Sequence, residues 1–428
     1  MERYSEYKDS GVKWLGEIPS HWEVVPLRKY LKINTRRNMP EAQLLSVTRE
    51  EGVIVRNVES KEENHNYIPD DLSNYKYVQR GQFVINKMKS WQGSYGVSNY
   101  DGIVSPAYFV YDLNYPNKDY FNIAIRSKIF SPFFSKYSKG IRVDQWDLTP
   151  EALKIIPFLE PPKAEQDAIV RYLDTATSEI DKAIAMQQKM IDLLNERKQI
   201  IIQNAVTKGL DENVEMKESG VEWIGRIPKH WEVVRLSHLT SKIGSGSTPK
   251  AGYVESGIIF LRSQNVYCEG LKLNDVVHIS ANVHRNMSGT KVLPNDVLMN
   301  ITGGSIGRCF YVDETLGEAN VNQHVSIIRP TSIDTHYLKY YLQSYCGQIQ
   351  VSLEQTGGNR EGLTAKALAK FLITYPSQSE QKEIAAYLDS EMQRFDSAIT
   401  NCQRQITLLQ ERKQIIINEV VTGKVRVS

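Results

Sequence analysis

The sequence predicts an α+β protein built from two related halves, each joining a mixed α/β domain to one long helix. The two helices are expected to pair as an antiparallel coiled coil about an internal pseudo-twofold axis. Two observations predict this fold class: a 21-residue box and a 47-residue helical segment each occur twice, in the same order. A third is that the regions between box and helix differ almost completely between the halves. The chain is therefore a tandem duplication of roughly 210 residues in which the scaffold parts stayed alike.

The box opens each half. Residues 7–27 read YKDSGVKWLGEIPSHWEVVPL and residues 216–236 read MKESGVEWIGRIPKHWEVVRL, with 14 of 21 positions identical. Each copy holds two tryptophans at the same spacing, and such large rings usually contribute to packing. We therefore expect four tryptophans to lie in the core or between domains: Trp14, Trp22, Trp223 and Trp231.

The helical segment closes each half. Residues 161–207 and 376–422 are identical at 23 of 47 positions, and both contain an EQ–YLD run followed by ERKQIII. Pro161 and Pro162 precede the first copy and Gly209 follows it, as is typical of helix boundaries. At about 1.5 Å rise per residue, residues 165–207 would form a helix roughly 60–65 Å long.

Within both helices, core-type residues recur at alternating steps of four and three, which is the heptad spacing of a coiled coil. A twofold relation between the halves would make the helices antiparallel and bring the two chain ends together. Two lysines interrupt the seam, and they either reach solvent and fix the register or form part of a docking surface. The seam runs through Ile180, Ile184, Gln187, Ile191, Leu194, Lys198, Ile201 and Ala205, and then through Phe395, Ile399, Cys402, Ile406, Leu409, Lys413, Ile416 and Val420.

The variable regions, about 36–150 and 237–370, carry short mixed patterns that predict an α+β domain on a mostly antiparallel sheet. The expected domain limits are 1–160 and 211–375 for the mixed domains, and 161–210 and 376–428 for the central and C-terminal helices. Strands are predicted at 81–86, 102–113, 257–263, 295–301 and 324–330, and helices at 118–130 and 334–350.

Loops of the variable regions carry groups suited to nucleic acid. Lysine and arginine pair with phosphates, whereas asparagine, glutamine and arginine can bond base edges. The NQH run (322–324) offers similar groups, although we interpret His278, His284 and His324 as structural because no metal-ligand spacing surrounds them. The candidates are Asn86, Lys87, Lys89, Trp91, Gln92, Ser94, Tyr95, Lys139 and Arg142 in the first region, and Ser245, Ser247, Thr248, Arg262, Gln264, Asn265, Thr302, Ser305, Asn359 and Arg360 in the second.

Composition and missing motifs exclude several classes of protein. Net charge is only +2, so any nucleic-acid surface must be local. The four cysteines form no CxxC pair, which argues against a zinc site or disulfide framework and fits a reducing cytoplasm. No apolar run predicts a membrane span or a signal sequence. GSGSTPK (244–250) lacks the GK[ST] ending of a phosphate loop, and we find neither catalytic nor metal residues.

The SGVxWxGxIPxHWEVVxL box and the EQxxIxxYLD…LLxERKQIII helix, each present twice, resemble the specificity subunit of bacterial type I restriction–modification systems. The resemblance covers essentially the whole chain. It implies two target recognition domains, each binding one half of a split, asymmetric site in double-stranded DNA. It also implies that the helices set the spacer between the half-sites and dock two methyltransferase subunits and the restriction motor subunits.

By the same resemblance this chain is non-catalytic. It would bind no cofactor, because S-adenosylmethionine, ATP and Mg²⁺ would belong to the partner subunits. The residues implied to dock subunits or pair the helices are Ile184, Ile191, Leu194, Lys198, Ile201, Ile399, Ile406, Leu409, Lys413 and Ile416. The alternative is a two-headed protein-binding scaffold, in which the coiled coil spaces two domains that lack positive patches.

Overall fold

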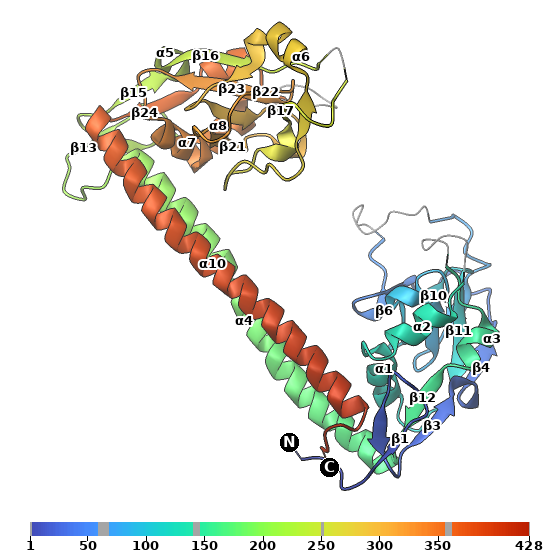
Figure 1. The fold of residues 1–428 in the computed structure, drawn as a ribbon. Helices are drawn as coiled ribbons and strands as arrows, with labels where there is room; N and C mark the ends of the chain where they lie inside the picture. The colour runs from blue at the N-terminus through green and yellow to red at the C-terminus, as the bar shows by residue number, and fades with distance from the viewer. Residues whose placement is uncertain (1, 59–67, 140–145, 250–251, 356–361, 428) are drawn as a thin grey trace. The chain divides into compact units, whose positions relative to one another are not determined.

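The computed structural model describes residues 2–58, 68–139, 146–249, 252–355 and 362–427. The chain forms two compact units, the first made of Met1–Gln188 with Arg404–Ser428 and the second of Lys189–Gln403. Each unit therefore holds one variable domain together with part of each long helix, α4 (Lys163–Lys208) and α10 (Gln378–Val421) (Figure 1).

The first unit centres on an antiparallel sheet of strand order β4-β11-β8-β9. Its inner strand β8 reads FVIN and is buried along its whole length, which suits a strand covered on both faces. The smaller two-stranded sheets are β1-β2, β3-β12, β5-β6 and β7-β10. The elements are β1 (Tyr7–Asp9), β2 (Glu17–Pro19), β3 (Glu23–Pro26), β4 (Leu31–Asn34), β5 (Leu45–Thr48), β6 (Gly52–Val55), β7 (Lys76–Val78), β8 (Phe83–Asn86), β9 (Tyr95–Val97), β10 (Gly102–Val104), β11 (Tyr108–Leu113), α1 (Lys118–Arg126), α2 (Ser131–Tyr137), α3 (Pro150–Lys154) and β12 (Pro157–Glu160).

The second unit repeats that plan with the sheet β16-β23-β20-β21, whose inner strand β20 reads VLMN and is again fully buried. It adds a second sheet, β18-β17-β22-β19, in which β17 and β22 pair in parallel. The elements are β13 (Met216–Glu218), β14 (Arg226–Pro228), β15 (Glu232–Arg235), α5 (Leu236–Leu239), β16 (Thr240–Ser245), β17 (Ile258–Leu261), β18 (Val277–Ile279), α6 (Ala281–Asn286), β19 (Lys291–Val292), β20 (Val297–Asn300), β21 (Cys309–Tyr311), β22 (Ala319–Val321), β23 (Val325–Pro330), α7 (Thr335–Gln343), α8 (Tyr345–Glu354), α9 (Ala365–Ala369) and β24 (Leu372–Tyr375).

The α+β class and the common scaffold of the two variable domains are confirmed, because both sheets have the same strand order. Predicted element ends move where local chemistry intervenes. The predicted strand 102–113 divides around Pro106 into β10 and β11. The predicted helix 334–350 divides at Ser344, whose hydroxyl accepts a hydrogen bond from Gly347 N and so caps α8.

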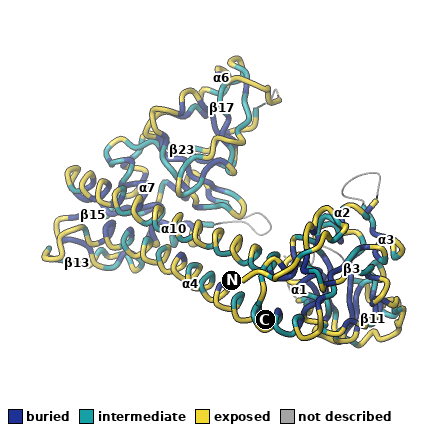
Figure 2. Tube along the Cα trace, turned by 60° about the horizontal axis from the view of Figure 1, so that its bottom comes forward, coloured by how far each residue is buried: buried dark blue, intermediate teal, exposed yellow. Residues whose placement is uncertain are grey.

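The helices α4 and α10 run antiparallel within each unit. In the first unit, Val420 of α10 shares a core with Ile169 of α4, and further along Lys413 meets Asp181. The predicted seam positions are all buried or half-buried. Figure 2 shows half-buried stretches alternating with exposed ones along both helices. Burial of the seam positions is what a heptad seam requires.

The two seam lysines form the same ion pair in each unit. Lys198 Nζ lies 2.5 Å from Asp396 Oδ1, and Lys413 Nζ lies 2.7 Å from Asp181 Oδ1. The aspartates occupy equal positions in the two repeats, as the lysines do. Because each pair links one helix to the other, the structure favours the register-fixing interpretation of these lysines.

In the first unit, the box is joined to both long helices. Trp22 is fully buried, and its Nε1 donates to Glu165 at the start of α4 over 2.9 Å. His21 Nε2 lies 2.6 Å from the other oxygen of the same carboxylate. Gly423, just past the end of α10, has φ +70°, and a Cβ there would lie 2.4 Å from Pro19. Only glycine lets the helix end pass this close beneath the box.

The second unit builds the same joint from the repeated residues. Trp231 Nε1 donates to Glu380 of α10 over 3.1 Å, and His230 Nε2 lies 2.7 Å from that carboxylate. Gly209, just past the end of α4, lies against the Trp231 ring. Burial raises the pKa of Glu380, but hydrogen bonds from His230, Ser377 and Trp231 outweigh it and lower the pKa to about 2. In each unit, the His-Trp pair of the box therefore contacts the glutamate of the EQ pair on the long helix.

The prediction that all four box tryptophans lie in the core or between domains is correct for Trp22 and Trp231, which are fully buried, whereas Trp14 lies at the surface. The Trp14 side chain is 41% exposed, with its ring edge against Phe133 and Lys136 Nζ 5.0 Å from the ring centre. Trp14 lies in the loop between β1 and β2. Trp223 is half-buried against the second core.

The two chain ends meet in the first unit, as the duplication predicts. Arg426 N donates to Glu2 O over 2.9 Å, and Tyr7 Oη donates to Gly423 O over 3.1 Å. The end of α10 thus runs back onto the first box.

Candidate nucleic-acid interface

In the first domain, the loop that carries Lys87 and Trp91 lies against the segment 146–148. Lys87 Nζ donates to Asp147 Oδ2 over 2.8 Å, and Leu148 N donates to Lys87 O over 3.2 Å. The Trp91 and Trp146 rings meet edge to face with centres 5.6 Å apart. The turn η2 (Ser90–Gln92) and the segment around 146–148 therefore form one surface, to which Lys139 belongs through its backbone pairing with Asp147.

The candidates on this surface differ in how accessible they are. Lys89, Gln92 and Lys139 are exposed. Ser94 and Tyr95 are corrections, because both are buried and the Tyr95 ring stacks on Phe134 within the core.

The Asn86 side chain is also largely buried and bonded within the domain. It is 8% exposed at the end of β8, and its Oδ1 accepts from Met88 N over 3.2 Å. Asn86 therefore helps to hold the turn that presents Lys89 and Gln92.

A basic cluster borders this surface that the sequence did not single out. It consists of Arg36, Arg37 and Lys76, next to Lys87. Lys76 is buried under Phe109 and donates to Tyr108 O. The pKa of Lys76 is lowered because burial desolvates the ammonium and because Arg37 and Lys87 add positive charge beside it. Among the described residues, no carboxylate lies within ion-pair distance of Arg36, Arg37 or Lys76.

In the second domain, backbone and amide bonds join the predicted loops. Gly246 N donates to Val325 O over 2.9 Å, which ties the end of β16 to β23. A Cβ on Gly246 would lie 2.0 Å from Val321 O, so this crossing requires glycine. Buried Asn300 donates to Ser263 O over 2.9 Å and to Ser305 Oγ over 3.2 Å. The loops after β16, β17 and β20 are thereby gathered around the β22–β23 turn.

Four side chains on these loops form a continuous line of hydrogen bonds, which we call the polar chain. Thr248 Oγ1 donates to Gln323 Oε1 over 2.8 Å, and Gln323 Nε2 lies 3.1 Å from His324 Nε2. His324 Nδ1 lies 2.6 Å from Thr302 Oγ1. Thr248 and Thr302 were predicted, whereas Gln323 was not and His324 was interpreted as structural. Only the NQH run pointed to this pair. Ser245 and Ser247 are exposed beside the polar chain.

The remaining candidates surround Asp275. Gln264 Nε2 donates to Asp275 Oδ2 over 2.9 Å, and Arg262 Nη2 donates to Asp275 O over 3.2 Å. Asn265 is a correction, because it is 1% exposed and its amide caps η4 (Ser263–Asn265) while donating to Lys272 O.

Three predicted residues lie outside the described ones: Arg142, Asn359 and Arg360. Across the residues that the structure describes, no group of three histidine, cysteine or acidic side chains could hold a metal ion. All four cysteines are free.

The chain is similar in sequence to proteins of one kind. A family model described as the type I restriction modification DNA specificity domain matches residues 228–410. A Methanocaldococcus jannaschii protein, provisionally named the MjaX type I restriction enzyme specificity subunit, is 26% identical over 98% of both chains. The MjaVIII specificity subunit of the same organism is 27% identical over 70% of this chain and 69% of its own length.

The fold matches as well. A chain from a study of complex assembly and conformational transition of the type I R-M system superposes with a TM-score of 0.71 at 16% identity. The superposition covers 95% of this chain and 99% of that one. The second half of the chain therefore carries a type I restriction modification DNA specificity domain, and the chain is similar over nearly its whole length to a type I restriction enzyme specificity subunit.

The family model spans the second variable region and part of α10. The first half carries the same box and helical segment, so the conserved parts occur twice. In the portions of the chain that are described, no helix is long and apolar enough to cross a membrane.

Proposed function

We propose that this chain directs a type I restriction–modification complex to DNA, with each variable domain binding one half of a split site in double-stranded DNA. The observation that carries the proposal is the convergence of polar loops in each domain, next to a basic cluster in the first and the polar chain in the second. Cations suit phosphates, and hydroxyl and amide groups suit base edges. A two-headed protein-binding scaffold would not need these surfaces.

We further propose that each unit docks one copy of the same methyltransferase subunit. On both helices, a leucine and an isoleucine that each directly precede a seam residue are exposed on the side that faces away from the seam. On α4 these are Leu193 (50% exposed) and Ile200 (43%), and on α10 they are Leu408 (47%) and Ile415 (55%). We call each pair an apolar stripe. The two stripes are identical between repeats although neither packs within its own unit, which suits two identical partners.

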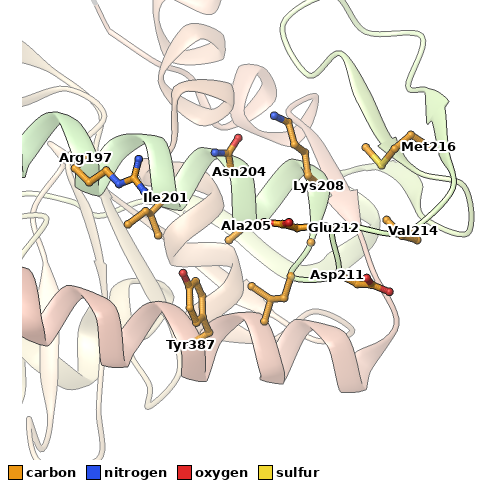
Figure 3. A pocket seen from close by; sticks show the side chains of 12 residues that line it. Arg197, Ile201, Asn204, Ala205, Lys208, Asp211, Glu212, Val214, Met216 and Tyr387 are labelled. Carbon is orange, nitrogen blue, oxygen red and sulfur yellow. The ribbon is translucent and has the colours of Figure 1, made fainter.

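A hollow of about 570 Å³ continues the stripe of the second unit. Arg197, which lies between Leu193 and Ile200 on α4, lines it together with Leu210. Figure 3 shows Tyr387 rising from α10 toward Ile201 on α4, with segment 209–216 closing the far side. Leu210 and Tyr387 are 45% and 41% exposed, so a partner's side chain could cover both.

In this proposal the chain supplies the address and its partners supply the chemistry. Methyltransferase subunits would bind S-adenosylmethionine and methylate adenine. Restriction subunits would bind ATP and Mg²⁺ and drive cleavage, and the whole complex would act in the cytoplasm.

The recognition role is tested by coexpressing the chain with its methyltransferase partner and mapping methylated bases across the host genome. We expect one split adenine motif that is absent without this chain. An intact complex that methylates no split motif would contradict the proposal.

The docking role is tested with Leu193→Asp and Leu408→Asp, alone and together. A charge on the stripe must be desolvated when a partner covers it. We expect each single variant to bind one methyltransferase copy instead of two, and the double variant to bind none, as measured by light scattering. Unchanged thermal unfolding of each variant is the control for folding, and two copies retained by the double variant would refute the docking surface.

A further inference from the structure

The polar chain of the second domain leaves hydrogen-bonding capacity unused at one of its exposed members, Gln323. Gln323 is exposed in the turn between β22 and β23. Its Oε1 accepts one hydrogen bond, from Thr248, and its Nε2 directs one hydrogen toward His324. An amide oxygen has two lone pairs and an amide nitrogen has two hydrogens. One acceptor position and one donor position therefore remain on the same planar group.

The Gln323 amide is oriented before any ligand binds. The His324 ring is held between Thr302 and Gln323, and its backbone is fixed at both groups. His324 N donates to Asn322 Oδ1 over 3.1 Å, and His324 O accepts from Ile301 N over 3.0 Å. A side chain that is already ordered loses less conformational entropy when it binds.

A paired acceptor and donor on one amide matches one base in the major groove. Adenine presents the N6 amino donor beside the N7 acceptor, whereas guanine presents two acceptors, O6 and N7. Cytosine offers a donor and thymine an acceptor, each without the second partner. The unused groups of Gln323 therefore fit adenine and mismatch the other three bases.

We infer that Gln323 reads an adenine in the half-site bound by the second domain, through two hydrogen bonds to its major-groove edge. Thr248 and His324 are positioning residues that set the plane and direction of the amide. Gly246 permits this arrangement, because the close crossing at Val321 brings Thr248 to Gln323. The inference rests on the proposed function and assigns one base contact within it.

The test uses the full chain assembled with its methyltransferase partner, after the split motif has been mapped. Duplexes that carry a substitution at one base pair at a time compete with the preferred sequence for binding. A two-bond contact should make the wild-type complex prefer one A·T pair of one half-site about ten- to hundredfold. Gln323→Ala should reduce that preference to about twofold or less and leave discrimination at every other position unchanged.

Two further variants sharpen the result. His324→Phe keeps a ring of similar size but removes the bonds to Thr302 and Gln323, so it should weaken discrimination at the same base pair. Gln378→Ala removes another exposed glutamine of the same unit, bonded instead to Ser332 O, and should leave all positions unchanged.

The outcomes separate this inference from the proposed function. A wild-type complex without any split motif overturns both. A clear wild-type motif that Gln323→Ala reads with unaltered discrimination at every base pair overturns this inference alone. A Gln323→Ala effect spread over both half-sites would also overturn it, because one amide cannot read both.

Discussion

The two units share their joints and differ in their loops. Trp22 and Glu165 in the first unit meet as Trp231 and Glu380 do in the second, and the Lys–Asp pair between helices also occurs twice. The loops at the sheet ends, in contrast, combine an ion pair with a tryptophan pair in one domain, and amide, hydroxyl and imidazole groups in the other. Duplication has thus preserved the contacts that place a domain on the helices and released the loops to vary.

The largest expected effect tests the shared part. Leu194→Asp in the second unit and Leu409→Asp in the first each place a charge in the helix seam, where it must be desolvated and where the lysine one turn further on, Lys198 or Lys413, is already paired with an aspartate. We expect each to lower the free energy of unfolding by about 3 kcal/mol or more, measured by chemical denaturation. Leu193→Asp, one residue away on the exposed side, is the control and should change stability by only about 0.5 kcal/mol. If the seam variants and the control lost the same free energy of unfolding, these positions would not form a buried seam. A large loss in only one unit would mean that the two units are not equivalent.

A second prediction tests the part that differs. Arg37→Ala and Lys89→Ala should weaken DNA binding by the first domain because each removes a cation suited to a phosphate. Each lost phosphate contact should reduce the slope of log affinity against log salt by about 0.9, with the mapped sequence preference unchanged. Lys163→Ala is the matched control, because this lysine lies on α4 and its Nζ is already paired with Asp167 Oδ2 over 2.9 Å. If the slope fell equally for the control variant, the basic cluster would not be part of the DNA interface.

The joints also predict a dependence on pH. The Glu380 pKa of about 2 lies below its usual value of 4.5, so this carboxylate stabilises the fold above about pH 4.5, and that contribution is lost as pH falls toward 2. Glu380→Gln should therefore show a shallower fall in melting temperature over this range than the wild type. Glu165, whose pKa is also lowered, should behave with the same sign in the first unit. Glu383→Gln, at an exposed glutamate, serves as control. If melting temperature fell with pH as steeply in Glu380→Gln as in the wild type, the contact of Glu380 with His230 and Trp231 would not stabilise the fold.

The smallest effect concerns helix register. Lys198→Asp should destabilise the protein by about 0.2–1 kcal/mol, as expected for a solvent-accessible ion pair. Adding Asp396→Lys should restore most of that loss, and the Lys413 and Asp181 pair should give the same cycle in the first unit. A double variant no more stable than Lys198→Asp would mean that the two charges do not interact.

Much of the scaffold could be predicted because it repeats. The heptad spacing located the seam, and the two copies of the box implied neighbouring chain ends. The loop contacts could not be predicted in the same way. Tyr95 and Asn265 have side chains suited to DNA, but burial depends on which strands flank them, and no local pattern encodes that pairing.

The site residues that sequence reasoning missed share one cause. Arg37 and Lys76 lie far apart in the chain and become a cluster only when β7 packs beside β11 and Tyr77 N bonds to Arg36 O. The Gln323 side chain is oriented by a hydrogen bond from Thr248, 75 residues earlier in the chain. That contact depends on the close approach of the backbone at Gly246. Single residues were visible in the sequence, whereas their neighbours required the fold.

The hydrogen bond between Arg426 N and Glu2 O holds these two residues, near the ends of the chain, side by side, so the path of the backbone is nearly a closed ring. The segment 209–216 passes continuously from the end of α4 to the second box, at the place where the first unit has its two ends. A short peptide joining the present ends, with a new opening at 210–215, would preserve the order of every contact around the ring. Such a circular permutant should fold, because the contacts that close each unit do not depend on where the chain begins.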